Sequence, residues 1–571
     1  MPTMATLPSS AQLARDRELA VHVAQRLPES GNQKASCQAI VACGRAAQWQ
    51  AALRELSGIF ASRAAQIVYS FSAAITACGK GLKWQIAVAL LAKMASAQTL
   101  PNVVSYSAAI SACEKGGEWQ AALQVLSGIF ASRTAPDVYS FSAAITACEK
   151  GLKWQIAVDL LQQMASVQTL PNVVSYSAAI SACEKGGEWQ MALSLLFRMA
   201  ASRHLPNTIS FSAAISACEK GGEWQIALTL LSQMPTAEAA PNEVSFNASI
   251  SACEKAGQWQ MALVLLSLMP AASVVPNHIS FNATISASEK ASKWQMALFL
   301  LSFMPAANVL PDKISFNASM SACEKAGEWR MALHLLSQMP AASAASNEIS
   351  FNAAISACEK GGAWELALLL FCQMPTVRSV PSEISYSAVM SACEKGGEWQ
   401  MALFLLSQMP EATVVPNKIT YSAGMSACEK AGRWQEALLL FTHLQKCAVA
   451  PDVINFGASI SACARVAEWQ MALGLLAFMP VARVLPGEII YNASISACEK
   501  ACEWKMALLL LSQMLSAGVV PSRISLSFLV SACELCGERS TAWTISGCRS
   551  MQNVLHASSL RSCRPHKYRV Q

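Results

Sequence analysis

The sequence predicts an all-α protein, an α-solenoid superhelix of about 15 stacked helical hairpins. Tryptophan recurs every 35 residues from Trp49 to Trp504, apolar residues follow helical spacing within each interval, and glycine or proline interrupts that spacing. A fixed period of roughly 20–50 residues is typical of repeat arrays. Because a hairpin of 35 residues cannot bury its own apolar face, we expect the units to share one continuous core.

The first helix of each repeat is defined by one apolar stripe. We number positions from Val173, so that the repeat Val173–Asn207 runs from position 1 to position 35. Tyr176, Ala179, Ile180 and Cys183 occupy positions 4, 7, 8 and 11, the i, i+3, i+4, i+7 spacing of an amphipathic helix. The glycine pair at positions 14 and 15 then predicts a helix end.

A second helix is expected to begin near Glu188 and to end in a loop closed by Pro206. Its predicted inward stripe is Trp189, Ala192, Leu193 and Leu196.

The repeat boundaries divide the chain into three segments. Residues 1–32 form an N-terminal extension, residues 33–540 the repeat array, and residues 541–571 a basic C-terminal tail. Repeats begin at Gln33, Val68, Val103, Val138, Val173, Thr208, Glu243, His278, Lys313, Glu348, Glu383, Lys418, Val453, Glu488 and Arg523. Met1–Ala14 contains no acidic residue, and the following stretch mixes arginines with acids, so the extension fits an organelle transit peptide only in part. It has no apolar core for a secretory signal.

The apolar composition suggests a membrane protein, but the positions of glycine and proline argue against a membrane-spanning helix. Hydrophobic residues make up 53% of the chain and charged residues 14%, and residues 256–288 carry no charge. Gly257, Pro270 and Pro276 interrupt that span, whereas a membrane-spanning helix needs about 20 mostly apolar residues in one unbroken helix. The net charge of +6 is too small to indicate nucleic acid by itself.

Cysteine is concentrated at position 11. Of 21 cysteines, 14 lie there, from Cys43 to Cys533, and Ser288 takes the remaining place. Neighbouring helices pack about 8–10 Å apart, too far for disulfides, so we expect buried thiols in a reducing compartment. Cys533 and Cys536 could bind zinc only with two more ligands, for which Cys548, His556 and Cys563 are candidates.

No catalytic motif, phosphate-binding loop or cofactor site occurs in the sequence, which predicts a protein that is not an enzyme and needs neither cofactor nor metal. No small-molecule substrate is expected.

A second face of the first helix contains positions 2, 5, 9 and 13. Position 2 is apolar, position 5 is mostly serine or asparagine, and position 13 is basic in fourteen successive repeats beginning at Arg45. Two interpretations of position 13 stay open: helix-end charges that complement the helix dipole, or contacts to regularly spaced phosphates. The candidate phosphate-contacting residues are Lys80, Lys115, Lys150, Lys185, Lys220, Lys255, Lys290, Lys325, Lys360, Lys395, Lys430, Arg465 and Lys500.

These features together resemble the pentatricopeptide repeat family, in the form of a P-type array with no appended catalytic domain. The period of 35 residues, the opening VSYSAAI at 174–180, the basic end of the first helix, the W-x-x-A-L second helix and the closing Pro-Asn or Pro-Asp carry the resemblance over residues 33–540. The tetratricopeptide repeat, a protein-binding module, is the alternative. Its period is 34 residues, and its W-x2-L-G-x2-Y pattern is not found here.

The resemblance implies that single-stranded RNA is bound with one base per repeat, read by positions 5 and 35 and sandwiched by position 2. An Asp acceptor suits the ring N–H of guanine or uracil, and an Asn amide suits adenine or cytosine. The paired residues and implied bases are Ser72 with Asn102 (A), Ser107 with Asp137 (G), Ser142 with Asn172 (A), Ser177 with Asn207 (A), Ser212 with Asn242 (A), Asn247 with Asn277 (C), Asn282 with Asp312 (U), Asn317 with Asn347 (C), Asn352 with Ser382 (pyrimidine), Ser387 with Asn417 (A), Ser422 with Asp452 (G), and Asn492 with Ser522 (pyrimidine). Gly457 with Gly487 has no side chain that could read a base.

The leading hypothesis is therefore a sequence-specific RNA-binding protein of a chloroplast or mitochondrion that acts in RNA processing, stability or translation. It would act by occupying RNA, with a separate RNA-processing enzyme as a further partner and no membrane. The second hypothesis is a protein-interaction scaffold, since loops also favour Asn, Asp and Ser at positions such as 35.

Overall fold

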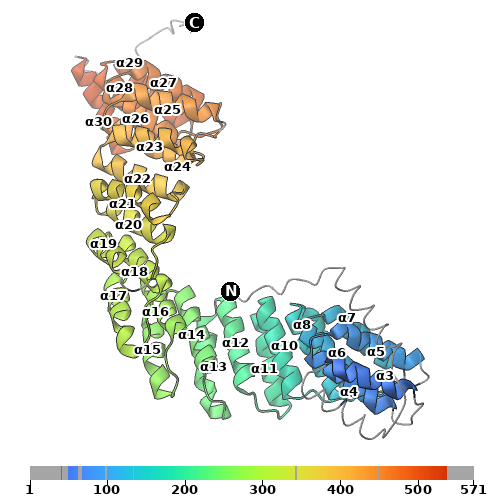
Figure 1. Cartoon of the computed structure of the whole chain (residues 1–571). Coiled ribbons are helices and arrows are strands. Elements are labelled where there is room, and N and C mark those ends of the chain that lie inside the picture. Colours follow the sequence, from blue (N-terminus) through green and yellow to red (C-terminus); the bar gives the residue numbers. More distant parts are fainter. Residues whose placement is uncertain are drawn as a thin grey trace. The chain divides into compact units, whose positions relative to one another are not determined.

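The structure is a computed structural model that describes Ile40 and residues 49–61, 67–96, 99–132, 134–340, 342, 344–447 and 449–536. Helices alternate with short loops throughout this part of the chain (Figure 1), and no β-strand occurs in it. The predicted all-α class is confirmed. The predicted extension 1–32 and tail 541–571 lie outside the described residues.

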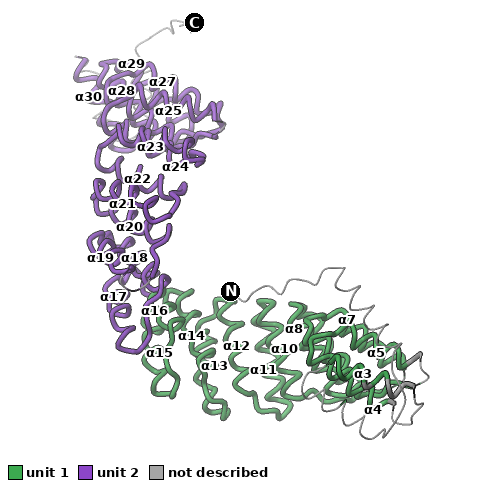
Figure 2. Tube along the Cα trace, in the orientation of Figure 1, with its two compact units in different colours: residues 1–287 green, residues 288–571 purple. Residues whose placement is uncertain are grey.

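The chain divides into two compact units, residues 1–287 and 288–571 (Figure 2). The helices of the first unit are α3 (Trp49–Ala61), α4 (Ile67–Lys80), α5 (Trp84–Ser96), α6 (Val103–Gly116), α7 (Trp119–Ala131), α8 (Val138–Lys150), α9 (Trp154–Ser166), α10 (Val173–Gly186), α11 (Trp189–Ala201), α12 (Thr208–Gly221), α13 (Trp224–Gln233), the 3-10 helix η1 (Pro235–Ala237), α14 (Glu243–Lys255) and α15 (Trp259–Ala271). The division falls within α16 (His278–Lys290).

The second unit repeats the same alternation. Its helices are α17 (Trp294–Phe303), η2 (Pro305–Ala307), α18 (Lys313–Ala326), α19 (Trp329–Gln338), α20 (Glu348–Lys360), α21 (Trp364–Gln373), η3 (Met374–Val377), α22 (Glu383–Gly396), α23 (Trp399–Glu411), α24 (Lys418–Lys430), α25 (Trp434–Lys446), α26 (Val453–Arg465), α27 (Trp469–Phe478), α28 (Glu488–Lys500), α29 (Trp504–Ser516) and α30 (Arg523–Leu535).

Most first helices begin with a side-chain cap, and several end with a glycine cap, as α10 shows. The Asn172 side chain accepts a hydrogen bond from the backbone N–H of Ser175, which satisfies one of the free amides at the start of α10. At the other end Gly187 has φ 78°, a left-handed conformation that turns the chain and lets its N–H bond back to the helix. The polar residue that closes one repeat therefore caps the first helix of the next.

The first helices stack on one another and carry the core of each unit. Helix α10 contacts α8 and α12, the first helices on either side, and also α9 and α11. The predicted stripe Tyr176, Ala179, Ile180 and Cys183 is buried. This packing confirms the predicted α-solenoid within each unit.

The predicted stripe of the second helix is partly wrong. The buried residues of α11 are Ala192, Leu195, Leu196 and Met199, whereas Trp189 and Leu193 are only half-buried. Helix α11 is therefore rotated about its axis from the expected orientation, so that Leu195 packs inward in place of Leu193.

The tryptophan period has a packing cause. A Cβ added to Gly186 would lie 2.3 Å from Cδ1 of Trp154, so the indole ring of one repeat rests on the position 14 glycine of the next. A small residue at position 14 and a tryptophan at position 17 thus set the distance between neighbouring hairpins.

The position 11 thiols are buried and free, as predicted, in every described repeat that carries them. Burial raises the pKa of the Cys218 thiol to about 11, so it is protonated at neutral pH. Among the described helices, none has both the length and the apolar character needed to cross a bilayer.

Candidate nucleic-acid interface

An apolar side chain projects into solvent from position 2 of each described repeat. Val174 is 58% exposed and Ile209 is 62% exposed, although large aliphatic side chains are usually buried. The row consists of Tyr69, Val104, Tyr139, Val174, Ile209, Val244, Ile279, Ile314, Ile349, Ile384, Ile419, Ile454, Ile489 and Ile524. Regularly spaced apolar surfaces of this kind suit flat apolar groups that stack one per repeat.

The side chain at position 35 is held by the start of the following helix. Wherever this residue is Asn or Asp, its Oδ1 accepts the backbone N–H of the residue three positions further on, at 2.8–3.1 Å. These residues are Asn102, Asp137, Asn172, Asn207, Asn242, Asn277, Asp312, Asn347, Asn417 and Asp452. Ser522 makes the same bond through its hydroxyl.

This cap decides which atom the residue can present to a ligand. Only an oxygen can accept the helix N–H, so the amide nitrogen of Asn102 is left as a donor and the second oxygen of Asp137 is left as an acceptor. Exchange of Asn for Asp therefore inverts the hydrogen-bonding character of the outward atom and leaves the cap intact.

Position 5 lies behind position 35 and supports it. The Ser177 hydroxyl donates to the Val173 carbonyl at 2.7 Å, contacts the Ser210 hydroxyl of the next repeat at 2.8 Å, and lies 3.5 Å from Asn207 Oδ1. Ser212 and Asn247 likewise donate to Oδ1 of Asn242 and Asn277, at 3.2 and 3.4 Å.

The structure therefore brings positions 5 and 35 into contact in the repeats of Ser177, Ser212, Asn247 and Asn317, and base reading by these residues stays a prediction. Asn282 and Asp312 belong to different units, and their pairing stays a prediction.

Position 3 has a structural role that the sequence analysis missed. Ser175 and Ser210 are fully buried and bridge position 35 to position 5 of the preceding repeat. The signal was the repeated hydroxyl or amide at this position. One repeat lacks this polar residue, and it also lacks the cap. Gly487 has no side chain that could cap the next helix, and position 3 of that helix is the apolar Ile490. A polar position 3 therefore occurs together with a capping position 35.

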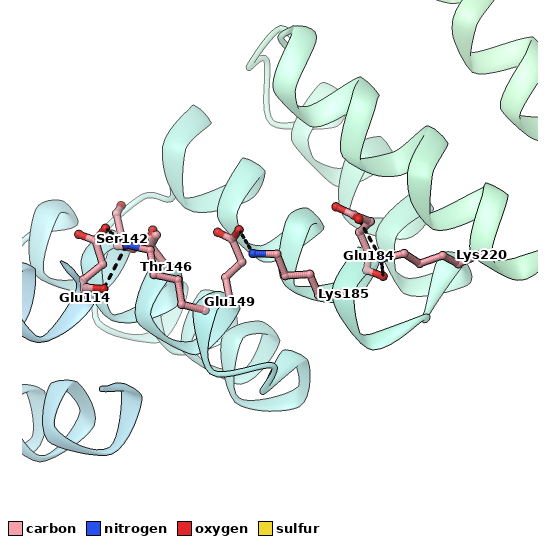
Figure 3. A network of polar contacts seen from close by, with 8 residues as sticks. Glu114, Ser142, Thr146, Glu149, Glu184, Lys185 and Lys220 are labelled. Atoms are coloured by element: carbon pink, nitrogen blue, oxygen red, sulfur yellow. Dashed lines mark hydrogen bonds and ion pairs between the residues drawn. The ribbon is translucent and has the colours of Figure 1, made fainter. Parts of the chain in front are cut away.

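The position 13 lysines form ion pairs between repeats (Figure 3). Lys185 Nζ lies 2.9 Å from Glu149 Oε1 and Lys220 Nζ lies 2.9 Å from Glu184 Oε1, each glutamate being at position 12 of the preceding repeat. Lys150, Lys255, Lys325, Lys360, Lys395 and Lys430 pair in the same way at 3.0–3.2 Å. Lys220 Nζ also donates to the Glu184 carbonyl at 3.1 Å, which satisfies the end of helix α10.

Three lysines of this row have no glutamate at the corresponding position of the preceding repeat. Gly44, Gly79 and Ala464 stand there for Lys80, Lys115 and Lys500. The row therefore consists of lysine–glutamate pairs over most repeats, and Lys80, Lys115 and Lys500 lack that partner. The helix-end interpretation accounts for the paired lysines, and their contact with phosphate stays a prediction.

The described residues hold no group of three or more histidine, cysteine or acidic side chains arranged for a metal ion. Cys533 and Cys536 are described, but Cys548, His556 and Cys563 lie outside the described residues. The predicted zinc alternative thus gains no support from this part of the chain.

Fold and surface together define a helical-repeat array that presents one apolar side chain and one capped amide or carboxylate per repeat. Family models match the sequence over most of its length. They are a pentatricopeptide repeat domain at residues 89–151, 124–188 and 159–221, a PPR repeat at 209–237, 244–274 and 489–519, and the pentacotripeptide-repeat region of PRORP at 312–468. The chain belongs to the pentatricopeptide repeat family.

Solved structures of the family have the same fold. The pentatricopeptide repeat protein PPR10 from maize is 20% identical, with a TM-score of 0.50 over 96% of this chain and 85% of that chain. PPR10 in complex with an 18-nt psaJ RNA element is 19% identical, with a TM-score of 0.52 over 96% and 88% of the two chains. No curated protein sequence matches this chain.

Proposed function

We propose that this chain binds single-stranded RNA in a sequence-specific manner, one nucleotide per repeat. The observation that carries the proposal is the recurrence, in successive repeats, of an exposed apolar position 2 beside a capped position 35 with one outward polar atom. Bases have flat apolar faces and polar edges, so each repeat matches one base.

The fixed outward atom supplies the base preference. The Nδ2 donor of Asn172 suits the ring acceptor of adenine or cytosine, and the second oxygen of Asp137 suits the ring N–H of guanine or uracil. Position 5 then distinguishes base size, serine going with purines and the longer asparagine with pyrimidines. Taken in repeat order from Ser72, the preference is A, G, A, A, A, C, U, C, pyrimidine, A, G, any base, pyrimidine.

The protein would act by occupying its RNA, and a separate enzyme would carry out any cleavage or editing. The PPR10 complex with RNA, which has this fold, supports an RNA ligand. We further propose that the protein works in a chloroplast or mitochondrion, on RNA processing, stability or translation. The scaffold alternative explains the helix caps and would also use exposed apolar side chains, but it gives no reason for one capped amide or carboxylate beside each of them.

Selection from a random RNA pool tests the proposal. The full chain is expected to enrich RNAs that contain the order of bases given above, with no preference at the repeat of Gly457 and Gly487. Enrichment of unrelated sequences, or no retention of RNA at all, would favour the protein-interaction scaffold.

A further inference from the structure

Position 1 changes character along the chain. It is valine in the repeats that begin at Val68, Val103, Val138 and Val173, and it is glutamate or lysine in most repeats from Glu243 onward. This residue opens the first helix and is exposed in Glu243, Glu383 and Lys418. No role in the fold requires a charge there, since valine serves in the first repeats.

Each charged position 1 side chain that makes a described polar contact meets a proposed base-reading residue of its own repeat. Lys418 Nζ lies 2.9 Å from Asp452 Oδ2, the oxygen that the cap leaves outward. Asn277 Nδ2 donates to Glu243 Oε1 at 2.5 Å, and Asn417 Nδ2 donates to Glu383 Oε1. In these three contacts Lys418 accompanies an outward acceptor, and Glu243 and Glu383 accompany outward donors.

Where position 35 is a short serine, the glutamate turns to position 5 instead. Asn352 Nδ2 lies 3.5 Å from Glu348 Oε1, and Asn492 Nδ2 lies 3.4 Å from Glu488 Oε1. In all four repeats that begin with glutamate, the carboxylate thus accepts from the amide of a base-reading asparagine.

We infer that the charged residue at position 1 is a third base-reading group, which contacts the exocyclic group of the base. The inference rests on the proposed function. Bases with a ring N–H, guanine and uracil, carry an exocyclic oxygen next to it, and bases with a ring acceptor, adenine and cytosine, carry an amino group there. Lys418 would donate to guanine O6 while Asp452 accepts from N1–H, and Glu383 would accept from the adenine amino group while Asn417 donates to N1.

The two contacts do not exclude one another. A carboxylate oxygen has two lone pairs and an amide nitrogen has two hydrogens, so Asp452 and Asn417 can serve position 1 and the base together. The wrong base then meets two mismatches instead of one: adenine at the repeat of Lys418 would place its ring acceptor against Asp452 and its amino group against an ammonium.

The chain contains its own matched control. The repeats of Val103 and Lys418 carry the same readers, Ser107 with Asp137 and Ser422 with Asp452, and differ at position 1. Lys313 contrasts with Lys418. The position 35 residue of its repeat is Asn347, whose outward atom is a donor, and Lys313 makes no described polar contact with it.

The test measures the ratio of affinities of the full chain for RNAs with G or A at the nucleotide assigned to each of these two repeats. We expect both repeats to prefer G, and the ratio to be about fivefold larger at the repeat of Lys418, the effect of one net hydrogen bond. Lys418→Val should reduce the ratio to that of the Val103 repeat, and Val103→Lys should raise the ratio there. Because a lysine also attracts phosphate regardless of sequence, the ratio is used instead of the affinity itself.

A base analogue identifies the contacted atom. Guanine replaced by 6-thioguanine keeps N1–H but has a poorer acceptor at position 6, so it should weaken binding at the repeat of Lys418 and not at the repeat of Val103. Unchanged ratios in both variants would overturn the inference and leave the proposed function standing. A Lys418→Val protein that binds G more tightly would do the same, because Lys418 would then merely mask Asp452. Absence of any G preference at the Val103 repeat of the unmodified chain would instead contradict the proposed function.

Discussion

Lys185 Nζ lies 2.9 Å from Glu149 Oε1, across the junction between two neighbouring repeats. The two side chains come from positions 13 and 12 of successive first helices, and the pair recurs in both units. The position 13 row therefore joins repeats to each other. A paired lysine can contact a phosphate only when its ion pair with the glutamate is broken or shared.

The first prediction concerns the dependence of RNA affinity on salt. Replacement of Glu149, Glu184 and Glu219 together by glutamine frees Lys185, Lys220 and Lys255 for phosphate. Affinity should rise, and the plot of log affinity against log salt should steepen by about 2, at ~0.7 per phosphate contact on single strands. Since exposed ion pairs contribute about 0–1 kcal/mol each, the array should remain folded.

The control for that experiment is glutamine at Glu118, Glu188 and Glu223, which make no described ion pair and change the net charge equally. An equal steepening in both triple variants would mean that only net charge matters.

The second prediction concerns a strained turn. Leu152 follows helix α8 at position 15 with φ 58°, a region that favours glycine, and its side chain is 62% exposed. Gly187 occupies the same position in the next repeat. Leu152→Gly should therefore raise the free energy of unfolding by about 0.5–1 kcal/mol, as relief of left-handed strain outweighs the added chain entropy. Thermal unfolding checks this value, and destabilisation would show that the Leu152 side chain packs more than its exposure indicates.

The third prediction concerns thiol reactivity. Cys372, Cys447 and Cys502 are exposed, whereas burial raises the pKa of Cys183 to about 12. At pH 8 an alkylating reagent should modify the three exposed thiols and leave the position 11 thiols unmodified until denaturant is added. Mass spectrometry after a timed reaction gives the answer, and rapid modification of Cys183 in the folded chain would contradict its burial.

The same thiols should make stability fall at alkaline pH. Their pKa values are raised in the folded chain, to about 11 for Cys253 and Cys323, above the ordinary value of 9.0. The unfolded chain therefore loses these protons first, so stability is full below about pH 9 and is lost as the pH rises toward 11. Denaturant unfolding at a series of pH values should show this decline, and a flat profile from pH 8 to 11 would contradict it.

Periodicity predicted the fold well because it depends on residues within one repeat. The stripe from Tyr176 to Cys183 and the tryptophan interval needed only helical spacing and one neighbour. The orientation of α11 was harder, since Leu193 and Leu195 are equally apolar and the neighbouring helices decide which one packs inward.

The interface was predictable in part for the same reason. Positions 5 and 35 came from the family resemblance, but the cap that orients Asn172 needs the geometry of the following helix. The Lys185–Glu149 pair joins residues 36 apart, and the contact of Lys418 with Asp452 joins residues 34 apart. Neither contact follows from the sequence until the spacing between hairpins is known.

The most direct test of base reading is the single change Asp137→Asn. Asn caps helices as well as Asp does, so helix α8 should keep its first turn and the stability should barely change. The outward atom becomes a donor, and the preference at that one nucleotide should move from G toward A by about 1 kcal/mol, one net hydrogen bond, while the other nucleotides keep theirs. The measurement is the binding of two RNAs that differ only at this base, before and after the change. If both proteins bind the two RNAs equally well, position 35 does not read bases in this chain and the account is wrong.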